Sequence, residues 1–236
     1  MIRFFSLTAS SATSGAEGGL CPPTDGEVHL WQFDLAAAQA ELEKLTELLS
    51  PDERARAARL RFQPAHARFI AGRGMLRIAL ARYLKIAPAT LSFTYTAQGK
   101  PLICGGELSF NLAHSHDVAL LAVANGPRVG VDLELIGDAN YEAIANHFFA
   151  PTEQQALLGL PLEQRRAAFY RAWTCKEAVL KAQGDGLALG LGHFTVSIDP
   201  AKPAALTHAS DPTAIERWRI HSWQPAEGFI AALAVE

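Results

Sequence analysis

The sequence predicts an α+β protein made of two similar lobes, and three observations support this. Helical patterns and short strand patterns follow one another along the whole chain. The order of a long helix followed by strands recurs in both halves with similar spacing. Asn125-Gly126-Pro127-Arg128 has the composition of a connector between the halves. We therefore expect a lobe at 1–125 and a lobe at 126–236, each a small antiparallel sheet packed on a long helix, with a ligand site at their seam.

The overall composition fits a globular protein. The chain has 236 residues, a formal charge of −3 and 49% hydrophobic residues, as expected for one large or two small domains. No apolar run is long enough to span a bilayer, and Met1–Leu7 lacks the layout of a secretory signal. The three cysteines are scattered, which predicts neither a disulfide framework nor a zinc site. These features favour a cytoplasmic protein without a membrane partner.

The first half of the chain can be divided into elements in order. Residues 10–19 are small, polar and Gly-rich, which predicts a flexible segment. Ser50 and Pro51 are typical of a helix start, as cap and first residue. Gly99 lies in a turn, where it is free to take a positive φ. The expected strands are 27–33, 91–96, 108–112 and 118–124, and the expected helices are 35–49, one that starts at Ser50, and 66–84.

Basic residues dominate the two helices between Ser50 and Lys85. This segment contains few acids beside its arginines and lysine: Arg54, Arg56, Arg59, Arg61, Arg68, Arg73, Arg77, Arg82 and Lys85. One interpretation is a pair of solvated helical faces; the other is an anion site, since arginine suits phosphate. The net acidic charge and the absence of interleaved aromatic residues argue against nucleic acid.

The segment 129–136 alternates like a strand. Val131, Leu133 and Leu135 point one way, and Asp132 and Glu134 point the other. Two carboxylates on one face repel each other unless a positive charge lies between them. A hard divalent cation with oxygen ligands is one solution; a wet, acidic edge strand is the other.

The second half is organised around one helix at 162–183, with residues 169–181 at its centre. Glu177 and Lys181 share a face because they are four residues apart, which a surface ion pair would also explain. Strands are expected at 194–198, 218–223 and 229–235. In the first half, His114 follows Asn111 among small residues; it is either a functional or a structural histidine.

Four motifs, in this order, resemble those of the Sfp-type 4′-phosphopantetheinyl transferases. They are Gly99–Pro101, Phe110–Ser115, Gly130–Glu134 and Trp173–Lys181. The helix at 67–77 and the pair Phe148-Phe149 followed by Thr152-Glu153 also match. The resemblance runs from about Ser50 to the last residue. The chain departs from the pattern at Ala113, where many relatives have serine, and Cys175 occupies a variable position.

The resemblance implies a pseudo-dimer of two α+β lobes and a specific reaction. Such an enzyme moves the phosphopantetheine arm of coenzyme A to a serine of an acyl or peptidyl carrier protein, and releases 3′,5′-ADP. By the same resemblance, Asp132, Glu134 and Glu177 bind Mg²⁺, Glu177 is the base, and Lys181 contacts a phosphate oxygen. Glu153 is either a helper behind the site or an acid favoured in the first turn of a helix.

Coenzyme A contacts follow from the resemblance as well. His114 would contact a phosphate, and Asn111 to Ala113 would line the same side of the coenzyme A site. Arg73 and Lys100 would hold the 3′-phosphate and adenine end, with backbone walls at Thr96 and Gly99. Lys176 would face phosphate or solvent. The arginines from Arg54 to Arg61 would meet the acidic helix of the carrier protein and raise the encounter rate. The family's habit predicts a monomer.

Two other functions fit the same residues. A non-catalytic module could bind coenzyme A or a carrier protein, although it would have no reason to keep Asp132, Glu177 and Lys181 together. A Mg²⁺-dependent pyrophosphate hydrolase would use the same ligands with water as the nucleophile. A carrier-protein acceptor separates transfer from hydrolysis, because only transfer modifies the protein.

Overall fold

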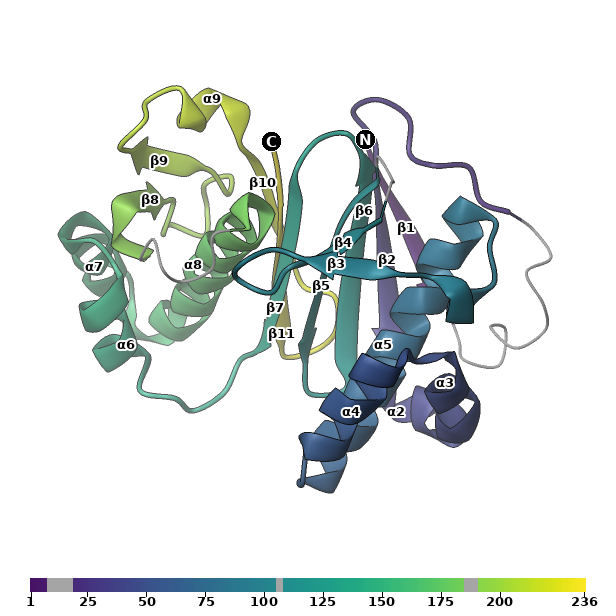
Figure 1. Ribbon diagram of the computed structural model, residues 1–236. Coiled ribbons are helices and arrows are strands. Elements are labelled where there is room, and N and C mark those ends of the chain that lie inside the picture. The colour runs from purple at the N-terminus through teal and green to yellow at the C-terminus, as the bar shows by residue number, and fades with distance from the viewer. Residues whose placement is uncertain (8–18, 105–107, 185–190) are drawn as a thin grey trace. The chain divides into compact units, whose positions relative to one another are not determined.

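The structure is a computed structural model that describes residues 1–7, 19–104, 108–184 and 191–236 (Figure 1). It divides into two units. The first comprises residues 1–96 and 101–126; the second comprises 97–100 and 127–236. Each unit contains one main sheet and one 22-residue helix, so the predicted α+β class is confirmed. Of the segment predicted to be flexible, residues 10–18 lie outside the described residues.

The first unit contains a four-stranded sheet in the order β1-β2-β6-β5. Its strands are β1 (Ile2–Leu7), β2 (Val28–Asp34), β5 (Leu108–Ser115) and β6 (Val118–Asn125). The pairs β2–β6 and β5–β6 are antiparallel, but β1 pairs with β2 in parallel. The prediction of a purely antiparallel sheet is therefore wrong for this unit. Parallel pairing needs a long return of the chain, and residues 8–27 provide the length for it.

The helices of the first unit gather around α5 (Gln63–Leu84) (Figure 1). They are α2 (Leu35–Ala38), the 3-10 turn η1 (Gln39–Glu41), α3 (Leu42–Leu48) and α4 (Pro51–Arg59). The single helix predicted at 35–49 is thus broken into three pieces. Tertiary packing accounts for the position of α3: a Cβ at Gly74 of α5 would lie only 2.8 Å from a methyl of Leu45. The predicted start of α4 is confirmed, with Ser50 as its cap.

The core of the first unit lies between α5 and the sheet. It contains Trp31 and Phe33 of β2, Leu121 of β6, and Met75 and Leu80 of α5, all buried. The 3-10 turn η2 (Pro88–Thr90) and the short hairpin of β3 (Phe93–Tyr95) and β4 (Pro101–Ile103) complete the unit.

A buried polar group joins β2 to α5. Trp31 donates its ring N–H to the Tyr83 hydroxyl at 2.7 Å, and that hydroxyl lies 2.9 Å from Nδ1 of His29. The other ring nitrogen of His29 lies 3.6 Å from a carboxylate oxygen of Glu27. Burial lowers the pKa of His29 from its ordinary value of 6.5, because it disfavours the charged imidazolium.

The second unit is built around α8 (Leu162–Gln183), which packs on the antiparallel sheet β10-β11-β7. The strands are β7 (Val129–Leu135), β10 (Arg219–Trp223) and β11 (Phe229–Val235). On its other sides α8 contacts α6 (Tyr141–Phe148), α7 (Pro151–Leu158) and β8 (Phe194–Val196) (Figure 1). The 3-10 turn η4 (Leu191–His193), β9 (Leu206–Ala209) and α9 (Ala214–Arg217) complete this unit. The predicted helix at 162–183 and strand at 229–235 are confirmed; α6, β9 and α9 were not predicted.

Helix α8 ends where the sequence indicates. Gly184 takes φ 81° as its C-cap, a conformation that glycine adopts without steric cost. Cys175 in its middle is fully buried, and burial raises the pKa of its thiol to about 12. Within the described segments, no helix is both long enough and apolar enough to cross a membrane.

Candidate active site

Strand β7 carries the predicted acidic pair of the second unit. Asp132 is only 4% exposed, and Glu134 is half-buried further along the same strand. β7 pairs with β11 along its whole length, with Asp132 opposite Ala232. β7 is the edge strand of its sheet, as one interpretation of the sequence expected, but its acidic face is not wet at Asp132, because that carboxylate is buried.

Gly130 allows β7 and α8 to lie unusually close together. A Cβ at this position would lie 2.0 Å from the carbonyl oxygen of Ala178 and 2.4 Å from the amide nitrogen of Ala182. Both partners are alanines one helical turn apart, so the helix presents a small-residue surface to the glycine. This contact places Asp132, two residues after Gly130, within reach of side chains on α8.

Lys181 of α8 binds Asp132 of β7. Its Nζ lies 2.5 Å from Oδ1 of Asp132, and the Lys181 side chain is 33% exposed. The sequence left open a surface ion pair between Glu177 and Lys181. The structure pairs Lys181 across to the buried aspartate instead.

Three carboxylates of this region influence one another. The pKa of Asp132 is raised to about 7, mainly by burial; Lys181 opposes this rise, and the charges of Glu134 and Glu177 add to it. Burial also raises the pKa of Glu177, with Lys181 opposing and Glu134 reinforcing the shift. The carboxylates therefore raise one another's pKa, and the charge of Lys181 opposes this effect at both Asp132 and Glu177.

One oxygen of this carboxylate group lacks a partner. Oδ2 of Asp132 is buried and accepts no hydrogen bond from the part of the chain that the structure describes. A buried acceptor without a partner is costly, and a hard cation with oxygen ligands would satisfy it. Nowhere in the described part of the chain do three or more His, Cys, Asp or Glu side chains lie together in an arrangement that could hold a metal. The three-carboxylate Mg²⁺ site thus stays a prediction.

Lys100 is held at the end of α8. Its Nζ lies 2.6 Å from the carbonyl oxygen of Lys181, 3.1 Å from that of Ala182 and 3.4 Å from that of Val129. These contacts tie the turn at 97–100 to both β7 and α8. Burial, with a smaller effect of Arg128, lowers the pKa of Lys100 to about 8. The preceding Gly99 takes φ 83°, as its place in a turn predicts.

Arg73, predicted to hold phosphate, lies in the first unit and is bound to a buried acid. Its Nε donates to Glu53 at 2.8 Å, and Arg77 donates to the other oxygen of Glu53 at 2.6 Å. Burial alone would raise the pKa of Glu53, but the two arginines hold it below the ordinary value. The Arg73 guanidinium also lies over the ring of Phe93. Glu53 therefore fixes the direction of Arg73.

Strand β5 separates the other predicted coenzyme A residues. It extends through Ser115, so the sequence prediction of a strand ending at Leu112 is too short. Asn111 and Ala113 are buried on one face of the strand, and His114 is exposed on the other. The expectation that all three line one wall does not fit this strand. Thr96 is half-buried at the end of the unit's small hairpin.

Lys176 faces neither phosphate nor solvent, so both predictions for it are wrong. It is fully buried, pairs with Glu153 at 2.9 Å, and donates to the carbonyl oxygens of Leu191 and Phe194. Glu153 also accepts from the backbone N–H of Val196 at 2.8 Å and from that of Ala150 at 3.0 Å. The pair ties α7, α8 and β8 together, which favours a structural role for Glu153.

Sequence reasoning missed the contacts that position these residues, and one signal could have found the most important one. Gly130 lies in an otherwise bulky strand, and Ala178 and Ala182 lie four residues apart on α8. A lone strand glycine often marks the close approach of another backbone. That signal would have placed α8 on β7 and Lys181 near Asp132.

Comparisons with known proteins identify the family. The family model described as 4′-phosphopantetheinyl transferase superfamily matches residues 128–234, and the model described as 4′-phosphopantetheinyl transferase, N-terminal, matches residues 34–126. The 4′-phosphopantetheinyl transferase HetI of Nostoc sp. is 40% identical over 89% of this chain and 87% of its own. The chain therefore belongs to the 4′-phosphopantetheinyl transferase superfamily.

Two further relatives carry the same enzyme name. The 4′-phosphopantetheinyl transferase psf-1 of Bacillus pumilus is 33% identical over 76% of each chain. The 4′-phosphopantetheinyl transferase Sfp of Bacillus subtilis is 29% identical over 70% of this chain and 74% of its own. The resemblance inferred from the four motifs is confirmed, and so is the predicted enzyme class.

Proposed function

We propose that this protein transfers the 4′-phosphopantetheine arm of coenzyme A to a serine hydroxyl of an acyl or peptidyl carrier protein, with Mg²⁺ as its metal. The observation that carries the proposal is the contact between Lys181 and the buried Asp132, with Glu177 one helical turn before the lysine. A binding module would not need a desolvated carboxylate next to a lysine and two further acids.

The reaction exchanges one phosphorus–oxygen bond for another. The serine oxygen bonds to the β-phosphorus of coenzyme A, the bond from that phosphorus to the bridging oxygen breaks, and 3′,5′-ADP leaves. The serine proton needs a base, and we assign this role to Glu177. Burial raises the pKa of Glu177, which brings a carboxylate closer to the pKa that suits a base at neutral pH.

The carboxylates and the lysine have separate roles in the proposal. Asp132, Glu134 and Glu177 would hold Mg²⁺, which when bound supplies positive charge to the pyrophosphate and the leaving phosphate. The unsatisfied Oδ2 of Asp132 supports this assignment. Lys181 would donate to a phosphate oxygen, and its partly exposed ammonium can exchange Asp132 for such an oxygen.

Coenzyme A would use residues of both units, and we propose that the active site forms where the lobes of the pseudo-dimer meet. Arg73, Thr96, Asn111, Ala113 and His114 belong to the first unit, while Gly99 and Lys100 belong to the second. The fixed guanidinium of Arg73 supports an anion contact there. Lys100 has a competing role, since its Nζ already binds carbonyl oxygens at the end of α8.

The carrier protein would meet the exposed arginines of the first unit. Arg54, Arg56 and Arg59 on α4, and Arg61 after it, are all exposed. A basic surface of this kind suits an acidic partner helix and acts mainly on the association rate.

The decisive experiment is intact-protein mass spectrometry of an apo carrier protein incubated with this enzyme, coenzyme A and Mg²⁺. Transfer to the serine nucleophile predicts a mass gain of about 340 Da on the acceptor, lost when EDTA is added. Release of 3′,5′-ADP without a mass gain would indicate hydrolysis. Coenzyme A binding without a gain on fatty acid, polyketide or peptide carriers would indicate a binding module.

A matched pair of variants separates the metal assignment from general charge effects. Asp132→Ala should abolish the mass gain, because it removes a metal ligand. Asp138→Ala removes an exposed aspartate that pairs only at the surface with Arg166, and should leave transfer unchanged. Normal turnover of Asp132→Ala in Mg²⁺ would contradict the metal assignment.

A further inference from the structure

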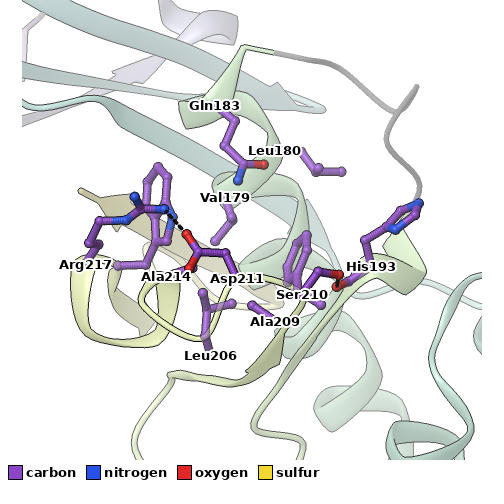
Figure 2. A pocket seen from close by; sticks show the side chains of 12 residues that line it. Val179, Leu180, Gln183, His193, Leu206, Ala209, Ser210, Asp211, Ala214 and Arg217 are labelled. Carbon is purple, nitrogen blue, oxygen red and sulfur yellow. Dashed lines mark hydrogen bonds and ion pairs between the residues drawn. The ribbon is translucent and has the colours of Figure 1, made fainter.

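The second unit contains a cavity of about 270 Å³ next to α8. Figure 2 shows Val179, Leu180 and Gln183 of α8 on one side of it and Leu206, Ala209 and Ala214 on the other. Helical spacing turns Val179 and Gln183 away from Lys181, which contacts β7, and none of Asp132, Glu134, Glu177 and Lys181 lines the cavity. The cavity is therefore separate from the candidate active site, although the same helix forms a wall of both.

The walls of the cavity are mainly apolar. Leu180, Phe194, Leu206 and Trp218 line it, and each is buried in the core of the second unit. At about 270 Å³ its volume lies near the lower end of small-molecule sites, which start at roughly 300 Å³. Walls of this kind suit the hydrocarbon part of a small ligand, since apolar surface is removed from water on binding.

An ion pair with half-exposed side chains lies at the rim of the cavity. Arg217 donates to Oδ2 of Asp211 at 3.0 Å, and Figure 2 marks this contact. The other oxygen of Asp211 accepts from the backbone N–H of Thr213 at 3.0 Å and from its hydroxyl at 2.7 Å. These Thr213 contacts, together with Arg217, lower the pKa of Asp211. Both oxygens of the aspartate thus accept hydrogen bonds, and its Oδ2 holds one nitrogen of the guanidinium.

The rim offers hydrogen-bond donors to a ligand. Among the described residues, Arg217 uses only one of its nitrogens in a hydrogen bond, and a guanidinium carries five N–H donors. Gln183 and His193 also line the cavity and form no side-chain hydrogen bond with any described residue. The charge of Arg217 also lowers the pKa of Glu236 slightly, but the Glu236 carboxylate is bound by Arg128 at 2.5 Å. Arg217 therefore offers donors only, while Gln183 and His193 each offer both a donor and an acceptor.

We propose that this cavity is a binding site for a small amphiphile with one carboxylate head and an apolar tail. The carboxylate accepts from the outward N–H groups of Arg217, with Gln183 and His193 as further donors, and the tail lies between Leu180, Phe194 and Trp218. An ammonium head is disfavoured, because Arg217 repels it and already neutralises the charge of Asp211. The site goes beyond the transferase reaction and does not depend on it.

Calorimetric titration of the full chain with three ligands that share one tail tests the charge preference. Octanoate should bind, octanol should bind more weakly, and octylamine should bind at least tenfold more weakly than octanoate. Arg217→Gln should weaken octanoate at least tenfold and leave octanol unchanged. Arg219→Gln removes a neighbouring arginine that does not line the cavity, and should leave all three affinities unchanged.

A second variant tests the location. Ala209→Leu adds three carbon atoms to the cavity wall and should abolish binding of both octanoate and octanol, while circular dichroism shows a retained fold. It decides the question even if Arg217→Gln fails to fold. The proposal is overturned if octanoate does not bind, if octylamine binds as tightly, or if Ala209→Leu binds octanoate normally.

Discussion

Lys181 Nζ lies 2.5 Å from Oδ1 of Asp132, and this contact links helix α8 to strand β7. The lysine is one third exposed and the aspartate is buried. A surface ion pair contributes about 0–1 kcal/mol, whereas losing the lysine here leaves a carboxylate uncompensated inside the protein. Substitution of Lys181 should therefore affect both the transfer reaction and the local stability of the fold.

Lys181→Ala should lower the transfer rate by about two orders of magnitude, because it removes the cation proposed for the phosphate. The mass-spectrometric assay gives the rate, and circular dichroism checks the fold. Lys44→Ala is the matched control, since Lys44 pairs with Glu41 on the surface of the first unit. Equal, small effects of both substitutions would mean that Lys181 makes only a salt bridge.

Gly130→Ala should destabilise the protein by at least about 2 kcal/mol, because its Cβ would overlap the backbone of α8 at Ala178. Urea unfolding measures this loss. Gly72→Ala is the control: its added Cβ would meet no atom within 4 Å apart from the backbone of its own helix and its chain neighbours, and alanine in a helix should stabilise by up to about 1 kcal/mol. A stable, active Gly130→Ala protein would show that β7 and α8 can move apart at no cost.

Lys176→Met should cost about 3–5 kcal/mol in the free energy of unfolding, because it leaves Glu153 buried without its cation. Glu153→Gln should cost a similar amount, and the double variant should cost less than the sum of the two. Arg166→Ala, which breaks an exposed pair with Asp138, should change stability by less than about 1 kcal/mol. Strict additivity at Lys176 and Glu153 would contradict a coupled buried pair.

His29→Asn should reduce the acid sensitivity of the fold. The pKa of His29 is lowered on folding from 6.5, so the unfolded chain binds more protons as the pH falls below 6.5. Stability is therefore present above that pH and is lost below it, by at most about 1.4 kcal/mol per pH unit. Asparagine keeps an acceptor for Tyr83 without the titration.

Urea unfolding at pH 7.5 and pH 5.5 measures the acid sensitivity of wild type and His29→Asn. His208→Asn, at an exposed histidine of β9, is the control and should behave as wild type. If wild type and His29→Asn lose the same stability between the two pH values, His29 is not the titrating group.

Lys100→Ala separates two roles of one lysine. Its contacts with the carbonyl oxygens of Lys181 and Ala182 favour a role in fixing the end of α8, so KM should rise equally for coenzyme A and for its analogue without the 3′-phosphate. A loss confined to coenzyme A would instead support the predicted contact with the 3′-phosphate. Steady-state kinetics with both substrates distinguish these outcomes.

The sequence predicted the elements whose patterns are long and regular. Helix α8 and strand β11 were placed correctly because their apolar periodicity is local. Strand β1 was missed, since a six-residue segment carries little pattern and its parallel pairing depends on residues far along the chain. The break in the helix at 35–49 depends on packing such as that of Leu45 on Gly74, which periodicity does not record.

The site shows the same division between local and tertiary information. The identities of Asp132, Glu177 and Lys181 followed from motifs, but the burial of Asp132 depends on its neighbours in space. Lys176 looked like a surface lysine because lysine is almost never fully buried unless paired, and its partner Glu153 is distant in sequence. Which residues carry charge is readable from sequence; which charges meet is a property of the packed chain.

The buried thiol of Cys175 can be used to detect when helix α8 separates from the elements packed on it. This thiol is buried inside the second unit, two residues before Glu177 on the same helix, whereas Cys21 and Cys104 are exposed. A thiol reagent should label the exposed pair at once and reach Cys175 only when α8 separates from its neighbours. The rate of that third labelling event would report how often the segment bearing Glu177 and Lys181 comes loose, without any change to the protein.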